Sequence, residues 1–388
     1  MGDQPSSNPD ARFVVALSSL PHIGPARLQA LLGSGSPADA WQALVAGRPP
    51  GAALPARVVD AVTAAARTTD VDALWTAHVD AGWQILTPED SGWPAQFVDD
   101  PEPPGVLFVD GHVGALSGPK VAIVGTRRCT RYGRDIATEL GAGLTSLGLG
   151  VVSGLALGID AAAHAGALGH LPTTDAGSPV AVVAGDLGRN VPRANSGLRC
   201  AIAQRGAVVS ETTMGAPMAR WRFPARNRLV AALTIAVVVV ESALDGGSMY
   251  TVDEALARGR VVFAVPGSVR SPVSIGTNRL LSDGALVCTS VDDLVTQLGM
   301  SLADQTATGV EAASGSSRPM SNLGVEPTGP DRSADALLLW DKLDAEPMVV
   351  DDLIAEVGLS VGRALGALDE LLRSGWAVRD GATVQRRR

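Results

Sequence analysis

Two arginine clusters carry the strongest chemical signal in the sequence. The first follows an apolar run at Val121–Val124 and reads GTRRCTRYGR, residues 125–134. The second, residues 218–228, holds four arginines, no acid and two interleaved aromatic residues, Trp221 and Phe223. Guanidinium groups bind phosphates through paired hydrogen bonds, and aromatic rings stack on bases. Together the clusters predict a groove for a polyanion such as single-stranded nucleic acid.

Each cluster also admits a plainer structural interpretation. The glycines near the first would serve as tight turns between a strand and a helix, and the arginines of the second would pair with distant acids on a surface helix. Trp221 and Phe223 would then belong to the core. We favour the groove because two arginine clusters bracket one predicted sheet in a chain whose net charge is −9.

Small and polar residues follow most of the predicted strands. Such segments occur at residues 153–160, 185–188, 246–248 and 266–268. In an open α/β sheet, ligands bind beyond the carboxyl ends of the strands, where glycines allow close approach and helix N-termini supply amide groups. The sequence therefore predicts a phosphate-binding rim along that edge of the sheet.

Signatures of catalysis are weak by comparison. Neither GxGxxG nor GxxxxGK[ST] occurs, and Ser153 and Ser248 lack a GxSxG context. Asp160 and His164 have the spacing of an acid–base pair on one helix face, although a helix N-terminal carboxylate near a packed histidine is the simpler interpretation. Glu241 is equally well explained as a base, a ribose ligand or a strand-end residue. We expect a binding protein that needs no cofactor or metal, rather than an enzyme.

Length and composition set wider bounds. The 388 residues are 46% hydrophobic, which is enough for several domains, and no apolar run is long enough to span a membrane. The three cysteines lie far apart, which argues against a disulfide scaffold or a cysteine-built zinc site. Because the first residues also lack the basic and apolar regions of a signal peptide, we expect a cytoplasmic protein.

The arginine clusters lie within an alternation of strands and helices, residues 85–298. The predicted strands are the apolar runs Val121–Val124, Val151–Val152, Val180–Val183, Ala207–Val209, Ile235–Val240, Val261–Val265 and Leu286–Cys288. The predicted helices between them include Tyr132–Leu147, Asp160–Leu168, Asn227–Leu233 and Thr251–Arg258. This pattern predicts an α/β fold, with a mostly parallel sheet and helices on both faces.

Smaller units flank this alternation. Residues 1–84 have helical spacing, and within them Leu17–Gly33 resembles half of a helix-hairpin-helix or, alternatively, a plain helical bundle with a glycine turn. Residues 299–332, rich in Ser, Gly and Pro, are predicted to be a flexible linker. Residues 333–388 show three amphipathic segments and a hairpin at Asp380–Gly381, the outline of a winged helix.

The middle unit resembles the DNA-processing protein A family, also called DprA or Smf. The matching segments cover about half of the chain in the family's order and read WPAQFVDDPEPPGVLFVDG, VAIVGTRRCTRYG, VVSGLALGIDAAAHAGAL, FPARNRLVAAL, VVVVESALDGGSMYTVDEAL and FAVPGSVRSPVSIGTNRLLSDGA. The helical N-terminal unit and the winged-helix-like C-terminal unit match an architecture that is seen in this family.

The resemblance implies a Rossmann-like domain that binds single-stranded DNA and forms a homodimer. It implies a cytoplasmic recombination mediator that protects incoming DNA and helps to load the RecA recombinase during natural transformation or recombination, without catalytic activity or cofactor. The family's DNA pocket carries over to Gly125–Arg127 and Phe223–Arg228, with the loops at Ser153–Gly154 and Gly246–Ser248 and with Asn278 as further lining candidates. Combined with the arginine clusters, this gives the candidate DNA-contacting residues Gly125, Thr126, Arg127, Arg128, Arg131, Ser153, Gly154, Arg222, Phe223, Arg226, Asn227, Arg228, Gly246, Gly247, Ser248 and Asn278.

The chain departs from the family pattern at several positions. Leu157 replaces the arginine of the usual SGLARGID loop, which puts one phosphate contact in doubt. Val191–Pro192 stands where a Tyr-Pro pair is common, and His170–Ser178 resembles a small insertion. The candidate recognition helix, Val361–Ser374, has a net charge of zero, so a protein contact suits it as well as DNA does.

Other functions compete with this interpretation. A related Rossmann-like enzyme, a nucleoside-monophosphate phosphoribohydrolase, needs a PGGxGTxxE loop with a catalytic glutamate. Asp245–Thr251 resembles this loop only loosely, and the first glutamate after it is Glu254. A DNA-architecture protein would instead bind mainly through its terminal domains. A nucleotide-hydrolysis assay tests the first alternative, and domain truncation with a DNA-binding assay tests the second.

Overall fold

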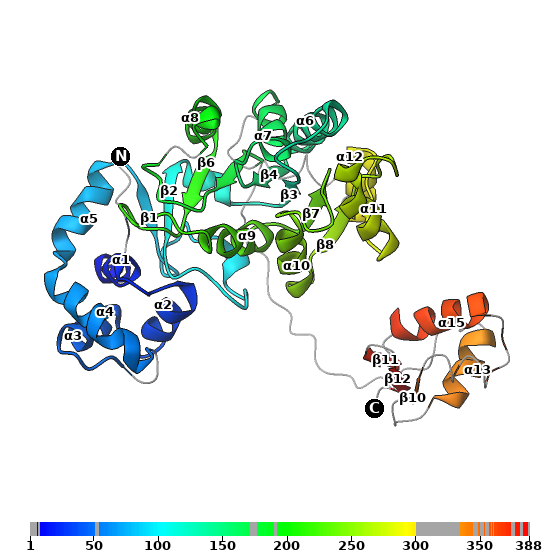
Figure 1. Cartoon of the computed structure of the whole chain (residues 1–388), viewed down its shortest axis with the longest axis horizontal. Helices are drawn as coiled ribbons and strands as arrows, with labels where there is room; N and C mark the ends of the chain where they lie inside the picture. The colour runs from blue at the N-terminus through cyan, green and yellow to red at the C-terminus, as the bar shows by residue number, and fades with distance from the viewer. Residues whose placement is uncertain are drawn as a thin grey trace, which may run out of the picture. The chain divides into compact units, whose positions relative to one another are not determined.

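The computed structural model describes residues 6, 8–50, 54–170, 177–189 and 192–299 and, with gaps, residues 334–386. Two compact units, residues 1–310 and 311–388, are described separately below (Figure 1). Several sequence predictions fall wholly or mostly outside the described residues: the linker at 299–332, the insertion at 170–178, Val191, the second amphipathic segment at 349–359 and the hairpin turn at Gly381.

A nine-stranded sheet forms the centre of the first unit, in the order β1-β2-β6-β5-β4-β3-β7-β8-β9. Its strands are β1 (Gln84–Leu86), β2 (Leu107–Gly111), β3 (Lys120–Val124), β4 (Gly150–Ser153), β5 (Val180–Val182), β6 (Ala207–Ser210), β7 (Ala236–Val239), β8 (Val261–Ala264) and β9 (Leu286–Val287). The pairings among β3 to β9 are parallel, whereas β2 pairs antiparallel with β6 and β1 antiparallel with β2. The prediction of a mostly parallel sheet is confirmed.

Helices cover both faces of the sheet, as Figure 1 shows. They are α6 (Arg131–Ser146), α7 (Ile159–Leu168), α8 (Ser196–Arg205), α9 (Arg222–Ala232), α10 (Met249–Ala257), α11 (Ile275–Ser282) and α12 (Val291–Gln297), with 3-10 turns at Ala95–Phe97, Val113–Leu116, Arg193–Asn195 and Pro272–Ser274. Successive residues of β3 point to opposite faces. Val121 and Ile123 share a core with α6 and α7, and Ala122 and Val124 share one with α9 and α10. Burial on both sides explains why the strands are almost continuously apolar.

The direction of chain progression reverses at β3. From β3 the chain proceeds through β4, β5 and β6 toward one edge, and it then returns to place β7, β8 and β9 on the other side of β3. A crevice forms where two such halves diverge at the carboxyl ends of the strands, and open α/β proteins bind ligands there. The fold therefore predicts a ligand site between β3 and β7.

The N-terminal helices form one hydrophobic core with part of the sheet. They are α1 (Ala11–Ser19), α2 (Pro25–Leu32), α3 (Pro37–Val45), α4 (Ala56–Thr68) and α5 (Val71–Asp80). His78 of α5 stacks on Phe108 of β2 with ring centroids 4.8 Å apart, and its Nε2 accepts a hydrogen bond of 3.0 Å from the Met214 amide. The predicted N-terminal helices are confirmed, and they belong to the same compact unit as the sheet.

The second unit has the outline of a winged helix. Its elements are α13 (Ala334–Lys342), α15 (Val361–Arg373) and the strands β10 (Met348–Val349), β11 (Ala377–Asp380) and β12 (Thr383–Arg386), in the order β10-β12-β11. Leu339, Leu353, Leu368 and Leu371 are buried in its core. The predicted hairpin of β11 and β12 is confirmed. Among the residues that the structure describes in both units, no helix combines the length and apolar character needed to cross a membrane.

Candidate nucleic-acid interface

A cleft of about 470 Å³ opens at the crevice between β3 and β7. The loops after β3, β4 and β7 form its walls together with the first turns of α9 and α10. Most of the sequence-predicted site residues meet here: the lining includes Gly125, Thr126, Arg127, Arg128, Gly154, Phe223, Arg226, Asn227, Gly246, Gly247 and Ser248. The topology of the sheet thus brings together loops that are more than a hundred residues apart in the sequence.

Close backbone packing at the floor of this cleft requires glycine at two positions. A Cβ atom on Gly125 would lie 2.6 Å from Cγ1 of Ile159 and 2.7 Å from the carbonyl oxygen of Glu241. Gly158 has a φ of +83°, and a Cβ there would lie 2.3 Å from the carbonyl oxygen of Thr126. The Thr126 amide, in turn, donates to the Glu241 carbonyl at 2.7 Å. These contacts fix the loop after β3, and with it the arginines that follow.

Arg127 and Phe223 both line the cleft and contact each other. The guanidinium carbon of Arg127 lies 5.8 Å from the centroid of the Phe223 ring, which is the geometry of a cation–π contact. Arg127 and its neighbour Arg128 are exposed, and Phe223 is half-buried. A phosphate donor therefore lies over an aromatic ring at the mouth of the cleft, and these are the two kinds of group that bind single-stranded nucleic acid.

Arg226, by contrast, is buried beneath the loop after β4. Its Nη1 donates to the carbonyl oxygens of Gly154, at 2.7 Å, and Val182, and its Nε donates to Oδ1 of Asn227 at 3.3 Å. Desolvation by burial lowers the pKa of Arg226, against the attraction of Asp160. This geometry indicates that Arg226 stabilises the loop after β4. A direct contact between Arg226 and a phosphate stays a prediction.

Asp160 completes this support from the first turn of α7. Its carboxylate accepts hydrogen bonds from the amides of Gly154, at 3.1 Å, and Ala156, at 3.3 Å. Burial raises the pKa of Asp160, and the positive charge of Arg226 opposes that rise. The interpretation of Asp160 as a helix N-terminal carboxylate fits this geometry better than an acid–base role.

The loop after β7 supplies the opposite wall. Ser248 donates from Oγ to Oγ of Ser242 at 2.8 Å, and Asn227 donates from Nδ2 to the Gly247 carbonyl at 3.4 Å. Tyr250, in the first turn of α10, lines the cleft and is 57% exposed. The sequence did not predict Tyr250, because its signal is slight: a single aromatic residue two positions after Ser248.

Five further predicted residues do not line this cleft. Ser153 is buried and donates from Oγ to the Ile123 carbonyl at 2.6 Å. Arg228 is buried and pairs with Glu211. Asn278 brackets Gly267, donating to its carbonyl at 3.0 Å and accepting from its amide at 3.1 Å. These three side chains are engaged within the protein, so the structure gives them a supporting position.

The other two of the five are more accessible. Arg131 has a side chain that is 94% exposed and lies 3.6 Å from Asp135, at the start of α6. Arg222 lines a neighbouring cleft and donates to Oγ1 of Thr212 at 3.0 Å.

Helix α9 begins at Arg222, whereas the sequence analysis predicted that this helix starts at Asn227. That prediction was wrong because Pro224 is tolerated in the first turn of a helix.

The candidate catalytic groups lie elsewhere or are engaged. Glu241 accepts hydrogen bonds from the amide and Oγ1 of Thr130, at 2.8 and 2.6 Å, and is buried. His164 is fully buried, and desolvation lowers its pKa to about 4. Within the described part of the chain, no group of three or more His, Cys, Asp or Glu side chains is placed to hold a metal ion.

The chain is similar to proteins described as DNA-processing proteins. One similar protein, from Mycobacterium tuberculosis, is described as putative DNA processing protein DprA. It is 41% identical to this chain over 231 residues, and the match covers 56% of this chain and 58% of that protein. The DNA processing protein DprA of Streptococcus pneumoniae is 38% identical over 194 residues, covering 50% of this chain and 67% of that protein. The chain therefore matches only part of the length of these curated relatives.

Solved structures show the same relationship. The structure of DNA processing protein A from S. pneumoniae matches with a TM-score of 0.63 at 28% identity and covers 76% of this chain and 99% of that one. DNA processing protein A from Helicobacter pylori, whose structure is described for its single-stranded DNA binding mode, matches with a TM-score of 0.50 at 31% identity, over 55% of this chain and 95% of that one.

Family sequence models match both units. The DprA winged helix domain matches residues 324–380. The model described as DNA recombination-mediator protein A matches residues 84–299, more than half of the chain. The chain therefore belongs to the DNA recombination-mediator protein A family.

Proposed function

We propose that this protein binds single-stranded DNA in the cleft between β3 and β7 and acts as a recombination mediator rather than as an enzyme. The observation that carries the proposal is the pairing of exposed Arg127 with Phe223 at the mouth of that cleft. Arg127 and Arg128 supply phosphate contacts, and Phe223 and Tyr250 supply faces on which unstacked bases lie.

Low sequence preference follows from the same geometry. The lining consists largely of glycine loops, two exposed arginines and two aromatic side chains, with no helix laid out to read base edges in a groove. Stacking and phosphate contacts are available to every base. The relative from H. pylori, which is described as binding single-stranded DNA, supports the same ligand for this chain.

The wider role is proposed from the family. We propose that the protein protects incoming DNA, helps to load the RecA recombinase during natural transformation or other recombination, and forms a homodimer through the Rossmann-like domain. A cytoplasmic location fits the three cysteines, which are all unpaired in the structure.

The rival hydrolase lacks a suitable acid in the cleft. Asp160 is the single acid among the described residues that line it, and its carboxylate is bonded to two amides. Glu254, the acid nearest to the required position in sequence, pairs with Arg258, which also bonds to Asp100. Nucleotide turnover that is abolished by Asp160→Asn or Glu254→Gln would promote the hydrolase.

Fluorescence anisotropy with the full-length chain tests the proposal. We expect an oligothymidine to bind more tightly than a duplex of the same length, and we expect the affinity to fall as salt rises, because phosphate contacts release counterions. Equal or tighter binding of the duplex would contradict the cleft as the main site. It would favour the alternative in which the terminal domains bind DNA.

A further inference from the structure

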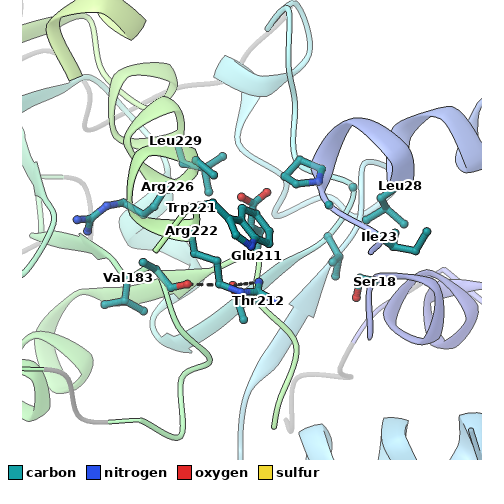
Figure 2. A pocket seen from close by; sticks show the side chains of 16 residues that line it. Ser18, Ile23, Leu28, Val183, Glu211, Thr212, Trp221, Arg222, Arg226 and Leu229 are labelled. Atoms are coloured by element: carbon teal, nitrogen blue, oxygen red, sulfur yellow. Dashed lines mark hydrogen bonds between the residues drawn. The ribbon is translucent and has the colours of Figure 1, made fainter. Parts of the chain in front are cut away.

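A second cleft lies between the N-terminal helices and the start of α9. It measures about 670 Å³. One wall is the turn between α1 and α2, residues 18–27, and the other is formed by Ala216, Pro217, Ala219, Trp221 and Arg222. In the adjoining space drawn in Figure 2, Ser18, Ile23 and Leu28 come from the N-terminal side, and Trp221 and Arg222 come from the α9 side. The second cleft therefore needs both the N-terminal helices and the segment that leads into α9.

Trp221 is the prominent feature of this second cleft. Its side chain is 49% exposed, although tryptophan is usually well buried. The guanidinium carbon of Arg222 lies 4.8 Å from the ring centroid, and Nη1 of Arg222 is anchored by its hydrogen bond to Thr212. The indole is therefore held in place by a neighbour while about half of its surface stays open to a ligand.

The two clefts both border the start of α9. Phe223 lines the main cleft, whereas Trp221 and Arg222 line the second, so the boundary between them is the first turn of α9. Two residues of chain span at most about 7 Å. Figure 2 shows the side chain of Arg226 directed away from the N-terminal helices, and Arg226 lines the main cleft. A strand that leaves the main cleft would have to cross only this turn to reach Trp221.

Charge at the second cleft suits a phosphate chain. The described residues that line it include Arg27, Arg222 and His22 and no aspartate or glutamate, in a chain whose net charge is −9. Arg27 donates from Nη1 to the His22 carbonyl at 2.6 Å, which keeps its guanidinium beside the turn. The amino end of α2, which begins at Pro25, adds the positive end of a helix dipole to the same wall.

We propose that the second cleft is a continuation subsite for the strand that occupies the main cleft. Trp221 stacks on a base, and Arg27 and the amino end of α2 contact the phosphates that follow. This inference rests on the proposed function, and it gives the N-terminal helical domain a direct part in binding. The length of single strand that the protein covers would therefore exceed what the sheet domain alone can hold.

Oligothymidines of two lengths test the subsite in the full-length protein. A strand of about 5 nucleotides is the short probe, and a strand of about 20 nucleotides is long enough to cross α9 as well. Trp221→Ala should weaken binding of the long strand about 10-fold, the loss of one base–aromatic stack, and leave the short strand within twofold. Trp221→Phe should restore most of the affinity, and Arg27→Ala should reduce the salt slope for the long strand by about 0.7.

Leu256→Ala is the matched control. Leu256 is an apolar side chain that is 61% exposed on α10 and lines neither cleft, so its loss should leave both lengths unchanged. Equal weakening of both lengths by Trp221→Ala, or no weakening of either, would overturn the subsite while leaving the main cleft in place. Failure of the wild-type protein to bind either length would instead overturn the proposed function itself. Thermal melts of each variant show whether a lost affinity reflects lost folding.

Discussion

Arg226 donates a hydrogen bond of 2.7 Å to the carbonyl oxygen of Gly154, although the two residues are 72 positions apart in the chain. A Cβ atom on Gly154 would lie 2.5 Å from the guanidinium nitrogens. The side chain therefore occupies the space beneath the loop after β4. The second arginine cluster accordingly divides into buried members, Arg226 and Arg228, and the more exposed members, Arg220 and Arg222.

Arg226→Ala should destabilise the fold. The substitution removes two hydrogen bonds to backbone carbonyls and leaves Asp160 buried without its positive neighbour. Breaking a buried charge arrangement of this kind costs about 3 kcal/mol. Arg226→Lys should recover only part of that loss, because an ammonium group lacks the planar fork. Chemical denaturation of both variants measures the effect, and an unchanged unfolding midpoint would contradict the supporting role of Arg226.

Arg127→Ala should do the opposite: weaken DNA binding and spare the fold. Arg127 is exposed and contacts Phe223. We expect single-stranded DNA to bind about 1–3 kcal/mol less tightly, the range for a charge-assisted hydrogen bond, and the salt slope to shrink by about 0.7. Arg205→Ala, at an exposed arginine on the last turn of α8, is the control and should leave affinity unchanged.

The opposite result for Arg127 is also clear. If Arg127→Ala lowers the melting temperature of the domain while the folded fraction keeps its affinity, the arginine stabilises the loop after β3. The plainer interpretation of the first cluster, in which its glycines and arginines serve only the turn, would then hold.

The parallel strands were predictable from the sequence because each is buried on both faces. All seven predicted apolar runs overlap observed strands, within one or two residues at either end. The two antiparallel strands, β1 and β2, were missed. The run Gln84–Leu86 is short, and Leu107–Gly111 ends in polar and glycine residues, so neither shows the continuous apolar character of a central strand.

The candidate site was only partly predictable, for a different reason. Glycines and arginines at the carboxyl ends of strands identified the loops that meet in the cleft. Which arginines are buried depends on tertiary partners that the local sequence does not show: Arg228 pairs with Glu211, and Arg226 lies beneath Gly154. The second cleft depends on how the N-terminal helices pack on the sheet, which no pattern within either segment reveals.

Leu157→Arg should raise affinity for single-stranded DNA. Leu157 is 42% exposed and, with Arg127 and Phe223, lines a cavity of about 150 Å³ that adjoins the main cleft. An arginine there adds one exposed positive charge beside the bound strand. We expect a gain of about 1 kcal/mol, roughly fivefold, and a salt slope that is steeper by about 0.7.

Leu256→Arg separates a local contact from a general effect of charge. Leu256 is 61% exposed on α10 and does not line the cleft. An equal gain from both substitutions would show that added positive charge alone strengthens binding. A gain confined to Leu157→Arg would place the strand along the loop after β4.

Stability should decline in mild acid because of a buried histidine. His164 is fully buried in α7, and desolvation lowers its pKa from 6.5 to about 4. The unfolded chain, with the ordinary pKa, binds a proton more readily than the folded one between these values, so falling pH favours unfolding. The stabilisation is fully present above pH 6.5 and is lost as the pH falls from 6.5 toward 4, by about 3 kcal/mol in all.

A non-titrating residue at this position should flatten that dependence. His164→Met places an adaptable apolar side chain in the same space. The free energy of unfolding of this variant should change less between pH 7 and pH 4.5 than that of the wild type. In the wild type, His164 accounts for about 2–3 kcal/mol of that change. His112 is exposed, so His112→Gln should retain the wild-type dependence. Urea unfolding at several pH values measures all three proteins. If the His164→Met curve runs parallel to the wild-type curve, the histidine titrates in the folded state as it does in the unfolded chain, and its burial is not what limits stability in acid.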